Sequence, residues 1–127
     1  MKILQVALAS AALVFATTSV NAGSALKDIL SGRVLKVGTT GDWNPMTMKN
    51  PADNSYTGYD IDVMKELGKD LGVKVEFVPT DWKTLVSGVV SGKYHMTGSA
   101  SISPARAKAA GYSDSYFSEG NEVHSLA

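Results

Sequence analysis

Hydrophobic and polar residues alternate along two stretches of the chain. Residues 34–39 and 73–78 alternate in this way and are rich in β-branched side chains, and residues 94–97 form a third, shorter candidate. Alternation with a period of two is typical of strands. We therefore predict three strands, the second of which is closed by Pro79.

Apolar residues recur at steps of three and four between these strands, which is the spacing of a helix with one buried face. One such segment begins at Asp60 and is stopped by Gly72, and its acidic first turn complements the helix dipole. A second segment follows Asp81, which can cap it, and ends at Gly92. The pattern predicts two helices, each connecting one strand to the next.

Two shorter helices and one long loop complete the prediction. Residues 25–30 form a short, weak helical segment. Ser103 followed by Pro104 is a preferred helix start, because Ser caps the helix and Pro fits its first position; this helix ends at Gly111. Residues 41–56 are rich in Gly, Pro, Asn and Asp, which predicts a loop.

The order strand, helix, strand, helix, strand, helix predicts an α/β fold in which a parallel sheet has helices on both faces. Ligands bind such sheets beyond the carboxyl ends of the strands. Two segments lie there: the loop 41–56 and the segment 99–106, which reads SASISPAR. We therefore expect a functional site between these two segments.

Composition narrows the class of protein. The 127-residue chain has no cysteine and a formal net charge of zero, without a cluster of Lys and Arg. These features fit one small soluble domain, exclude a disulfide framework and argue against a nucleic-acid partner.

The first 22 residues have the pattern of a secretory signal peptide. Lys2 supplies a positive start, residues 3–16 are apolar except at two positions, and Val20-Asn21-Ala22 is a small-x-small cleavage site. A membrane anchor is the alternative, but the apolar run is shorter than the roughly 20 residues that a bilayer requires. We expect cleavage after Ala22, export to the periplasm and no membrane insertion of the remaining chain.

The segment 99–106 combines hydroxyls with one guanidinium. In an extended segment Ser99, Ser101 and Ser103 lie on one side, and Ser103 also serves as the helix cap. The backbone N–H groups of the following helix favour an anion, and the donor fork of Arg106 matches a carboxylate. This pattern predicts a socket for a small carboxylate. The alternative is ordinary helix punctuation beside a solvated arginine.

Two tryptophans are further candidates. Trp43 lies in the loop 41–56, where an indole can stack on the apolar part of a ligand or fold back onto the domain. Trp82 opens the second helix, and we expect it to pack on the sheet, although its position also faces the strand ends.

Other chemistry has weaker support. Residues 88–93, GVVSGK, resemble a phosphate-binding loop, but the spacing is one residue short and the segment closes a helix. His95 is isolated in a strand, and Asp60 and Asp62 are interpreted as helix-start charges. We predict no catalytic residue, no metal and no cofactor in this chain.

Four segments together resemble the periplasmic solute-binding proteins of the polar amino-acid type (family 3), and the resemblance covers residues 26–117. They are VLKVGTTGDWNPM, YTGYDIDVMKELGKDLG, VEFVPTDWKTLVSGVVSGKY and GSASISPARAKAAGYSDSYF. The resemblance implies a periplasmic-binding-protein type II fold, whose two lobes close on an amino acid or related carboxylate. It also implies delivery of that ligand to an ABC importer through its permease.

The resemblance assigns ligand contacts to seven residues: Thr40, Trp43, Trp82, Gly98, Ser99, Ser101 and Arg106. It implies that Trp43 stacks on the ligand and that Arg106 clamps the ligand's carboxylate. Ser99 and Ser101 would bind the same carboxylate, Ser101 through its hydroxyl. Trp82 would line the cleft.

An enzymatic alternative rests on two of these segments. VGTTGDWNP and FVPTDW are also similar to the cyclohexadienyl dehydratase branch of the family. That resemblance implies decarboxylation and dehydration of prephenate or arogenate by a catalytic acid of the second lobe, which nothing in this chain replaces.

The resemblance also predicts that the chain is an incomplete, amino-terminal fragment. A complete family member is about twice as long, and residues 118–127 do not resemble the expected hinge strand. Ser115 stands where the family usually has Pro. We expect residues 23–117 to form the first lobe only, with an exposed sheet edge. Ligand binding by this half-site should be no tighter than about millimolar.

Overall fold

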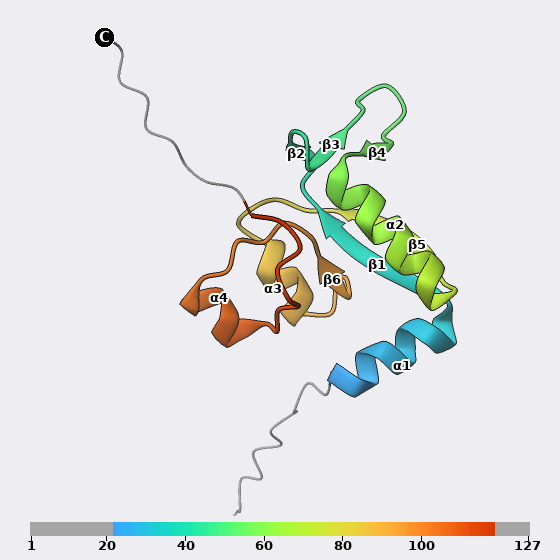
Figure 1. Cartoon of the computed structure of the whole chain (residues 1–127), viewed down its shortest axis with the longest axis vertical. Helices are drawn as coiled ribbons and strands as arrows, with labels where there is room; N and C mark the ends of the chain where they lie inside the picture. Colours follow the sequence, from blue (N-terminus) through green and yellow to red (C-terminus); the bar gives the residue numbers. More distant parts are fainter. Residues whose placement is uncertain (1–21, 119–127) are drawn as a thin grey trace, which may run out of the picture.

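The computed structural model describes residues 22–118 of the chain (Figure 1). The predicted signal peptide, apart from Ala22, lies outside this range, as do residues 119–127 of the predicted tail. Within the described range, none of the helices combines the length and the apolar character that a membrane crossing requires.

A parallel sheet of three strands forms the centre of the fold. Strand β1 (Val34–Thr39) lies between β5 (Lys74–Pro79) and β6 (Met96–Thr97), and both neighbours pair with it in parallel. The predicted parallel strands are therefore confirmed, with β6 shorter than expected. The side chain of His95 explains this difference, because the backbone N–H of Lys36 donates to its Nδ1 at 2.9 Å, in place of a backbone carbonyl.

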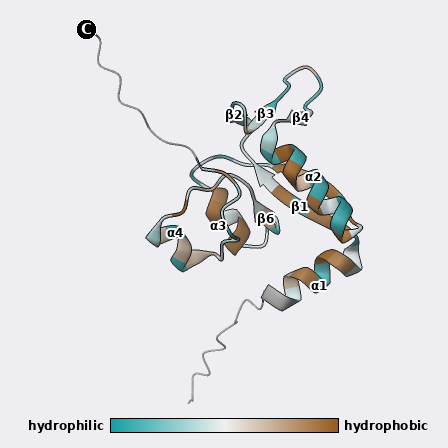
Figure 2. Ribbon diagram, viewed as in Figure 1, coloured by the Kyte–Doolittle hydropathy of each residue, from teal (hydrophilic) through white to brown (hydrophobic). Residues whose placement is uncertain are grey.

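One face of the sheet carries the hydrophobic core. Leu35 and Val37 point to this face, where Met64 of α2 (Tyr59–Leu71) and Ile29 of α1 (Ala22–Gly32) pack against them. Figure 2 shows hydrophobic colour along much of β1, whereas α2 carries both colours, as an amphipathic helix does. Helix α2 ends at Gly72, which adopts the left-handed conformation, as predicted.

The opposite face of the sheet is covered by Tyr94 and by α3 (Leu85–Val90). Tyr94 is fully buried, and a Cβ added at Gly38 of β1 would lie 2.5 Å from its ring. Its hydroxyl donates to the carbonyl of Leu85 at 2.7 Å. Gly38 follows Val37 in β1 and therefore points to the opposite face of the sheet. Helices thus cover both faces, as predicted.

The prediction that Asp81 caps a helix opened by Trp82 is wrong. The Oδ1 of Asp81 accepts hydrogen bonds from the backbone N–H and the hydroxyl of Thr84, both at 2.9 Å. These bonds close a turn over residues 82–84, and the helix begins only at Leu85. Trp82 is therefore 40% exposed and lies outside the core.

The predicted loop 41–56 also contains regular structure. Strands β2 (Asp42–Trp43), β3 (Thr47–Lys49) and β4 (Tyr56–Thr57) form a small antiparallel sheet. Gly41 adopts a positive φ, and its carbonyl accepts from the N–H of Lys49 at 2.9 Å. The strands are too short to produce a periodic pattern, which is why the composition alone indicated a loop.

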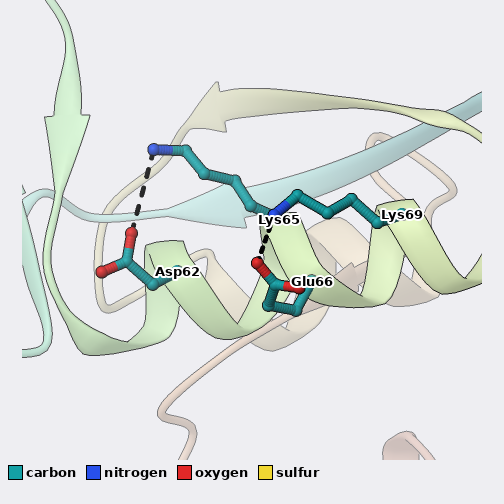
Figure 3. Close-up of polar contacts among 4 residues, drawn as sticks. All are labelled: Asp62, Lys65, Glu66 and Lys69. Atoms are coloured by element: carbon teal, nitrogen blue, oxygen red, sulfur yellow. Dashed lines mark hydrogen bonds and ion pairs between the residues drawn. The ribbon is translucent and has the colours of Figure 1, made fainter.

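The remaining helices follow their predicted caps. Helix α4 (Pro104–Ala109) begins after Ser103, whose hydroxyl accepts from the N–H of Arg106, and it ends two residues before Gly111. On α2, Asp62 pairs with Lys65 at 3.9 Å, and Glu66 pairs with Lys69 (Figure 3). Such exposed pairs contribute little to stability.

Candidate functional site

Two hollows lie beyond the carboxyl ends of the central strands. The larger is a cleft of about 350 Å³, lined by residues 99–102, residues 112–118, Trp43, Met46 and Asp60. The smaller is a cavity of about 10 Å³ directly at the end of β1. The cleft joins the two segments in which the sequence predicted a site.

The structure brings most of the predicted ligand contacts to these hollows. Trp43, Ser99 and Ser101 line the cleft, whereas Thr40, Trp82 and Gly98 line the smaller cavity together with Ser99. Arg106 is not among the residues that line either hollow. It is partly buried on α4, directly behind the loop that forms one wall of the cleft.

The two tryptophans pack against each other. Trp43 lies on β2, and its ring meets that of Trp82 edge to face, with centroids 5.6 Å apart and an angle of 69°. The indole N–H of Trp82 donates to Oδ1 of Asp42 at 3.0 Å. This bond and the ring contact hold the half-buried indole of Trp43 and the exposed indole of Trp82 together as an aromatic wall at the strand ends.

The serines of the segment 99–106 do not lie on one side as predicted. Ser99 has a φ of 57°, in the left-handed region, so the segment is not extended at this point. Its Oγ is buried and has no hydrogen-bond partner among the described residues, whereas Ser101 is exposed. Of the two serines that were expected to bind the ligand, Ser101 therefore has the hydroxyl accessible from the cleft.

Arg106 holds the backbone of its own loop. Its Nη1 donates to the carbonyl of Ser101 at 3.1 Å, and the hydroxyl of Tyr112 donates to the same carbonyl at 3.2 Å. A guanidinium carries five N–H donors, so several remain available for another acceptor.

The buried carboxyl group of Asp60 pairs with Tyr116, whose side chain is exposed, and the sequence analysis did not predict this pair. Asp60 is 2% exposed, and its Oδ1 accepts from the hydroxyl of Tyr116 at 2.9 Å. Its Oδ2 has no partner among the described residues. Burial raises the pKa of Asp60, and burial together with the Asp60 carboxylate raises the pKa of Tyr116 to about 12.

A signal for Asp60 was present in the sequence. The residue lies four positions before Met64 and next to Ile61, so it shares the buried face of α2. Its position in the first turn suggested a charge that complements the helix dipole, so the burial of Asp60 was not predicted. Tyr116 had no such signal, because it lies 56 residues from Asp60.

The chemistry of the site is that of a binding cleft. Polar groups of the loop 99–102 and the rings of Trp43, Tyr112 and Tyr116 line the cleft together. Such a surface can hold a small molecule with a polar head group and a body that stacks on rings. Within residues 22–118, no group of three or more His, Cys, Asp or Glu side chains is arranged to hold a metal ion.

Comparison with known proteins gives a consistent result. Residues 35–126 match the family model described as bacterial extracellular solute-binding proteins, family 3. The chain is 33% identical over 115 residues to a cyclohexadienyl dehydratase of Pseudomonas aeruginosa, covering 90% of this chain and 42% of that protein. It is 29% identical over 118 residues to a probable amino-acid ABC transporter-binding protein of Haemophilus influenzae, covering 92% of this chain and 45% of that protein.

Solved structures show the same likeness. An ancestral cyclohexadienyl dehydratase is 48% identical with a TM-score of 0.67, covering 72% of this chain and 38% of that one. A mutant of domain 1 of TmArgBP, in an arginine-bound form, is 29% identical with a TM-score of 0.66, covering 72% and 71%. The chain thus spans less than half the length of the two curated relatives but most of that single domain.

Proposed function

Because the chain belongs to the bacterial extracellular solute-binding proteins of family 3, we propose that it is the amino-acid-binding first lobe of an importer's binding protein. The fold is part of a type II periplasmic binding protein, as the sequence predicted. The proposed ligand is an amino acid or related carboxylate, and the proposed destination is an ABC permease. Family members act outside the cytoplasmic membrane, and we propose periplasmic export of this chain through its signal peptide.

One observation carries the proposal. The cleft of about 350 Å³ brings the indole of Trp43 and the loop of Ser99 and Ser101 together from the ends of two different strands. One side offers hydroxyl and backbone donors to a carboxylate, and the other offers an aromatic surface to the rest of the ligand.

Arg106 would enter the site by exchanging partners. Its guanidinium now donates to a neutral carbonyl, that of Ser101. A carboxylate is a stronger acceptor and can take two parallel N–H bonds from the same fork. A ligand carboxylate beside Ser101 would therefore attract the guanidinium toward the cleft. Thr40, Trp82 and Gly98 line the adjoining cavity and would support the wall of the site.

A related single domain supports ligand binding by an isolated first lobe. The crystal structure of the TmArgBP mutant is that of domain 1 in an arginine-bound form. The present chain covers that domain with a similar fold, which supports ligand binding without a second lobe.

The experiment is a titration of the exported chain with L-arginine, L-histidine, L-cystine and acetate. The readouts are tryptophan fluorescence and amide chemical shifts of the loop 99–102. We expect saturable shifts in this loop for at least one amino acid and weaker ones for acetate. Shifts confined to distant surfaces, or none at millimolar ligand, would contradict the proposal.

Dehydratase chemistry is the second candidate function. The observation in its favour is the likeness to a named cyclohexadienyl dehydratase and to an ancestral one. We propose that this chain alone is not an enzyme, because the implied catalytic acid belongs to a second lobe. Prephenate incubated with the chain should give no phenylpyruvate above the uncatalysed rate, and its appearance would favour the dehydratase function.

A further inference from the structure

Three segments that are distant in the sequence meet at Gly98 and Ser99. The backbone N–H of Ser99 donates to the Oη of Tyr116 at a long 3.4 Å. A Cβ added at Gly98 would lie 3.2 Å from the Asp60 carboxyl group and 3.3 Å from Tyr116 Oη. The first turn of α2 and the segment 112–118 therefore pack directly on the backbone that follows β6.

Ser99 needs such support because of its conformation. It has a φ of 57°, and a residue with a Cβ adopts the left-handed region only when its surroundings hold it there. Its own side chain does not supply the support, since its buried Oγ has no partner among residues 22–118. The backbone bond to Tyr116 is the polar contact that remains.

The hydrogen bonds run in one direction. Tyr116 has a single hydroxyl hydrogen, which it donates to Asp60 at 2.9 Å, so its oxygen is free to accept from Ser99. A carboxylate acceptor strengthens such a chain, because each bond polarises the next. The residue at the end of this chain, Asp60, is itself buried, which limits the competition of water for its carboxyl oxygens.

We propose that Asp60 and Tyr116 are positioning residues that hold Ser99 in its left-handed conformation and thereby shape the wall of the binding cleft. The effect on ligand binding rests on the proposed function, whereas the effect on the Ser99 backbone does not. Neither residue needs to touch the ligand for this role.

The test is Tyr116→Phe in the full chain, which removes one hydroxyl and keeps the ring. We expect amide hydrogen exchange of Ser99 to become about tenfold faster or more, while the amides of β1 keep their rates. In a titration with L-arginine, we expect affinity to fall about tenfold or more. Unchanged exchange at Ser99 would overturn the proposal.

Tyr59→Phe is the matched control. The ring of Tyr59 lies 6.3 Å from that of Tyr116, but its hydroxyl bonds to none of the described residues. This variant should leave the hydrogen exchange of the Ser99 amide unchanged. An effect equal to that of Tyr116→Phe would overturn the proposal, because loss of any nearby tyrosine hydroxyl would then speed the exchange.

Asp60 gives a second, independent pair of variants. Asp60→Asn keeps a carbonyl acceptor for Tyr116 and should retain most of the slow exchange of Ser99, whereas Asp60→Ala should lose it. Equal rates in the two variants would overturn the proposal even if Tyr116→Phe does not fold. If wild-type chain binds no L-arginine but the exchange rates behave as stated, the proposed function fails on this ligand and the positioning role stands.

Discussion

At the level of single residues, small side chains around Tyr94 determine whether α3 can pack on the sheet. A Cβ added at Gly88 of α3 would lie 2.2 Å from the Tyr94 hydroxyl, and one added at Gly38 would lie 2.5 Å from its ring. The ring is fully buried and its hydroxyl is bonded to Leu85, so it cannot move aside cheaply.

Gly88→Ala should therefore destabilise the fold by about 1–3 kcal/mol, the usual cost of overpacking a core. The measurement is the midpoint of urea unfolding followed by circular dichroism. Gly32→Ala is the control, because a Cβ added there meets nothing within 4 Å. A midpoint for Gly88→Ala as high as that of the control would mean that Tyr94 is packed more loosely than the structure shows.

A second residue-level prediction concerns Asp60. Burial raises its folded pKa above the ordinary value of 3.8. A carboxyl group shifted in this direction stabilises the fold below its unfolded pKa, and that contribution is lost as pH rises through the folded pKa. When the Asp60 carboxyl is ionised, the folded wild-type chain holds a buried charge whose Oδ2 has no partner among residues 22–118.

Asp60→Asn removes that charge and should raise stability at neutral pH by about 1 kcal/mol. The gain should shrink as pH falls from neutral into the acidic range, because the wild-type carboxyl then becomes protonated as well. Urea midpoints measured across this range check the expectation, with the exposed Asp62→Asn as control. A gain that does not depend on pH would show that the charge of Asp60 is not its cause.

Arg106 gives a third prediction at this level. In a complete two-lobed protein, Arg106→Ala should weaken ligand binding by about 2 kcal/mol or more, because the ligand carboxylate would lose a charge-assisted bond. Isothermal calorimetry measures the change, and Lys108→Ala tests for loss of any exposed positive charge on the same helix. Equal affinities for wild type and Arg106→Ala would leave Arg106 with its observed role of holding the Ser101 carbonyl.

At the level of elements, short strands and turns carry the residues of the site, whereas the longer β1 and α2 form the framework beneath them. The prediction was accurate for β1 and for the ends of α2, because their periodicity and the stop at Gly72 act within a few residues. It failed for β2, β3 and β4, whose pairing depends on Gly41 meeting Lys49 across a turn. It also failed for the start of α3, where Asp81 caps a turn instead.

The edges of the central sheet differ in their protection. Strand β5 carries exposed Lys74, Glu76 and Pro79, residues that discourage pairing with another chain. Strand β6 pairs with β1 over only two residues and has no further neighbour among the described strands. Among the described strands, β5 and β6 are thus both edges of the sheet, and β6 is the less protected of the two.

For the molecule as a whole, the extent to which the cleft encloses its ligand limits the binding affinity. The described cleft has one wall from each of two strand ends, and Tyr59, Tyr116 and Phe117 near it are each more than 40% exposed. Hydrogen bonds in a cleft open to water contribute little, because water competes for the same groups.

We therefore expect the chain to bind amino acids no more tightly than about millimolar, near −4 kcal/mol. Calorimetry of the chain with the amino acid found by titration gives the value. Micromolar binding would mean that the single lobe encloses its ligand more fully than its cleft suggests.

Residues close in the sequence were enough to establish the α/β order, the parallel sheet and the segments at the strand ends, since strand period, helix period and caps are local properties. The pairing of Asp60 with Tyr116, the left-handed turn at Ser99 and the edge-to-face contact of Trp43 with Trp82 were not accessible in that way. Each depends on a contact between segments 17 to 56 residues apart. Such contacts form only when packing of the whole domain brings the segments together, which local periodicity does not encode.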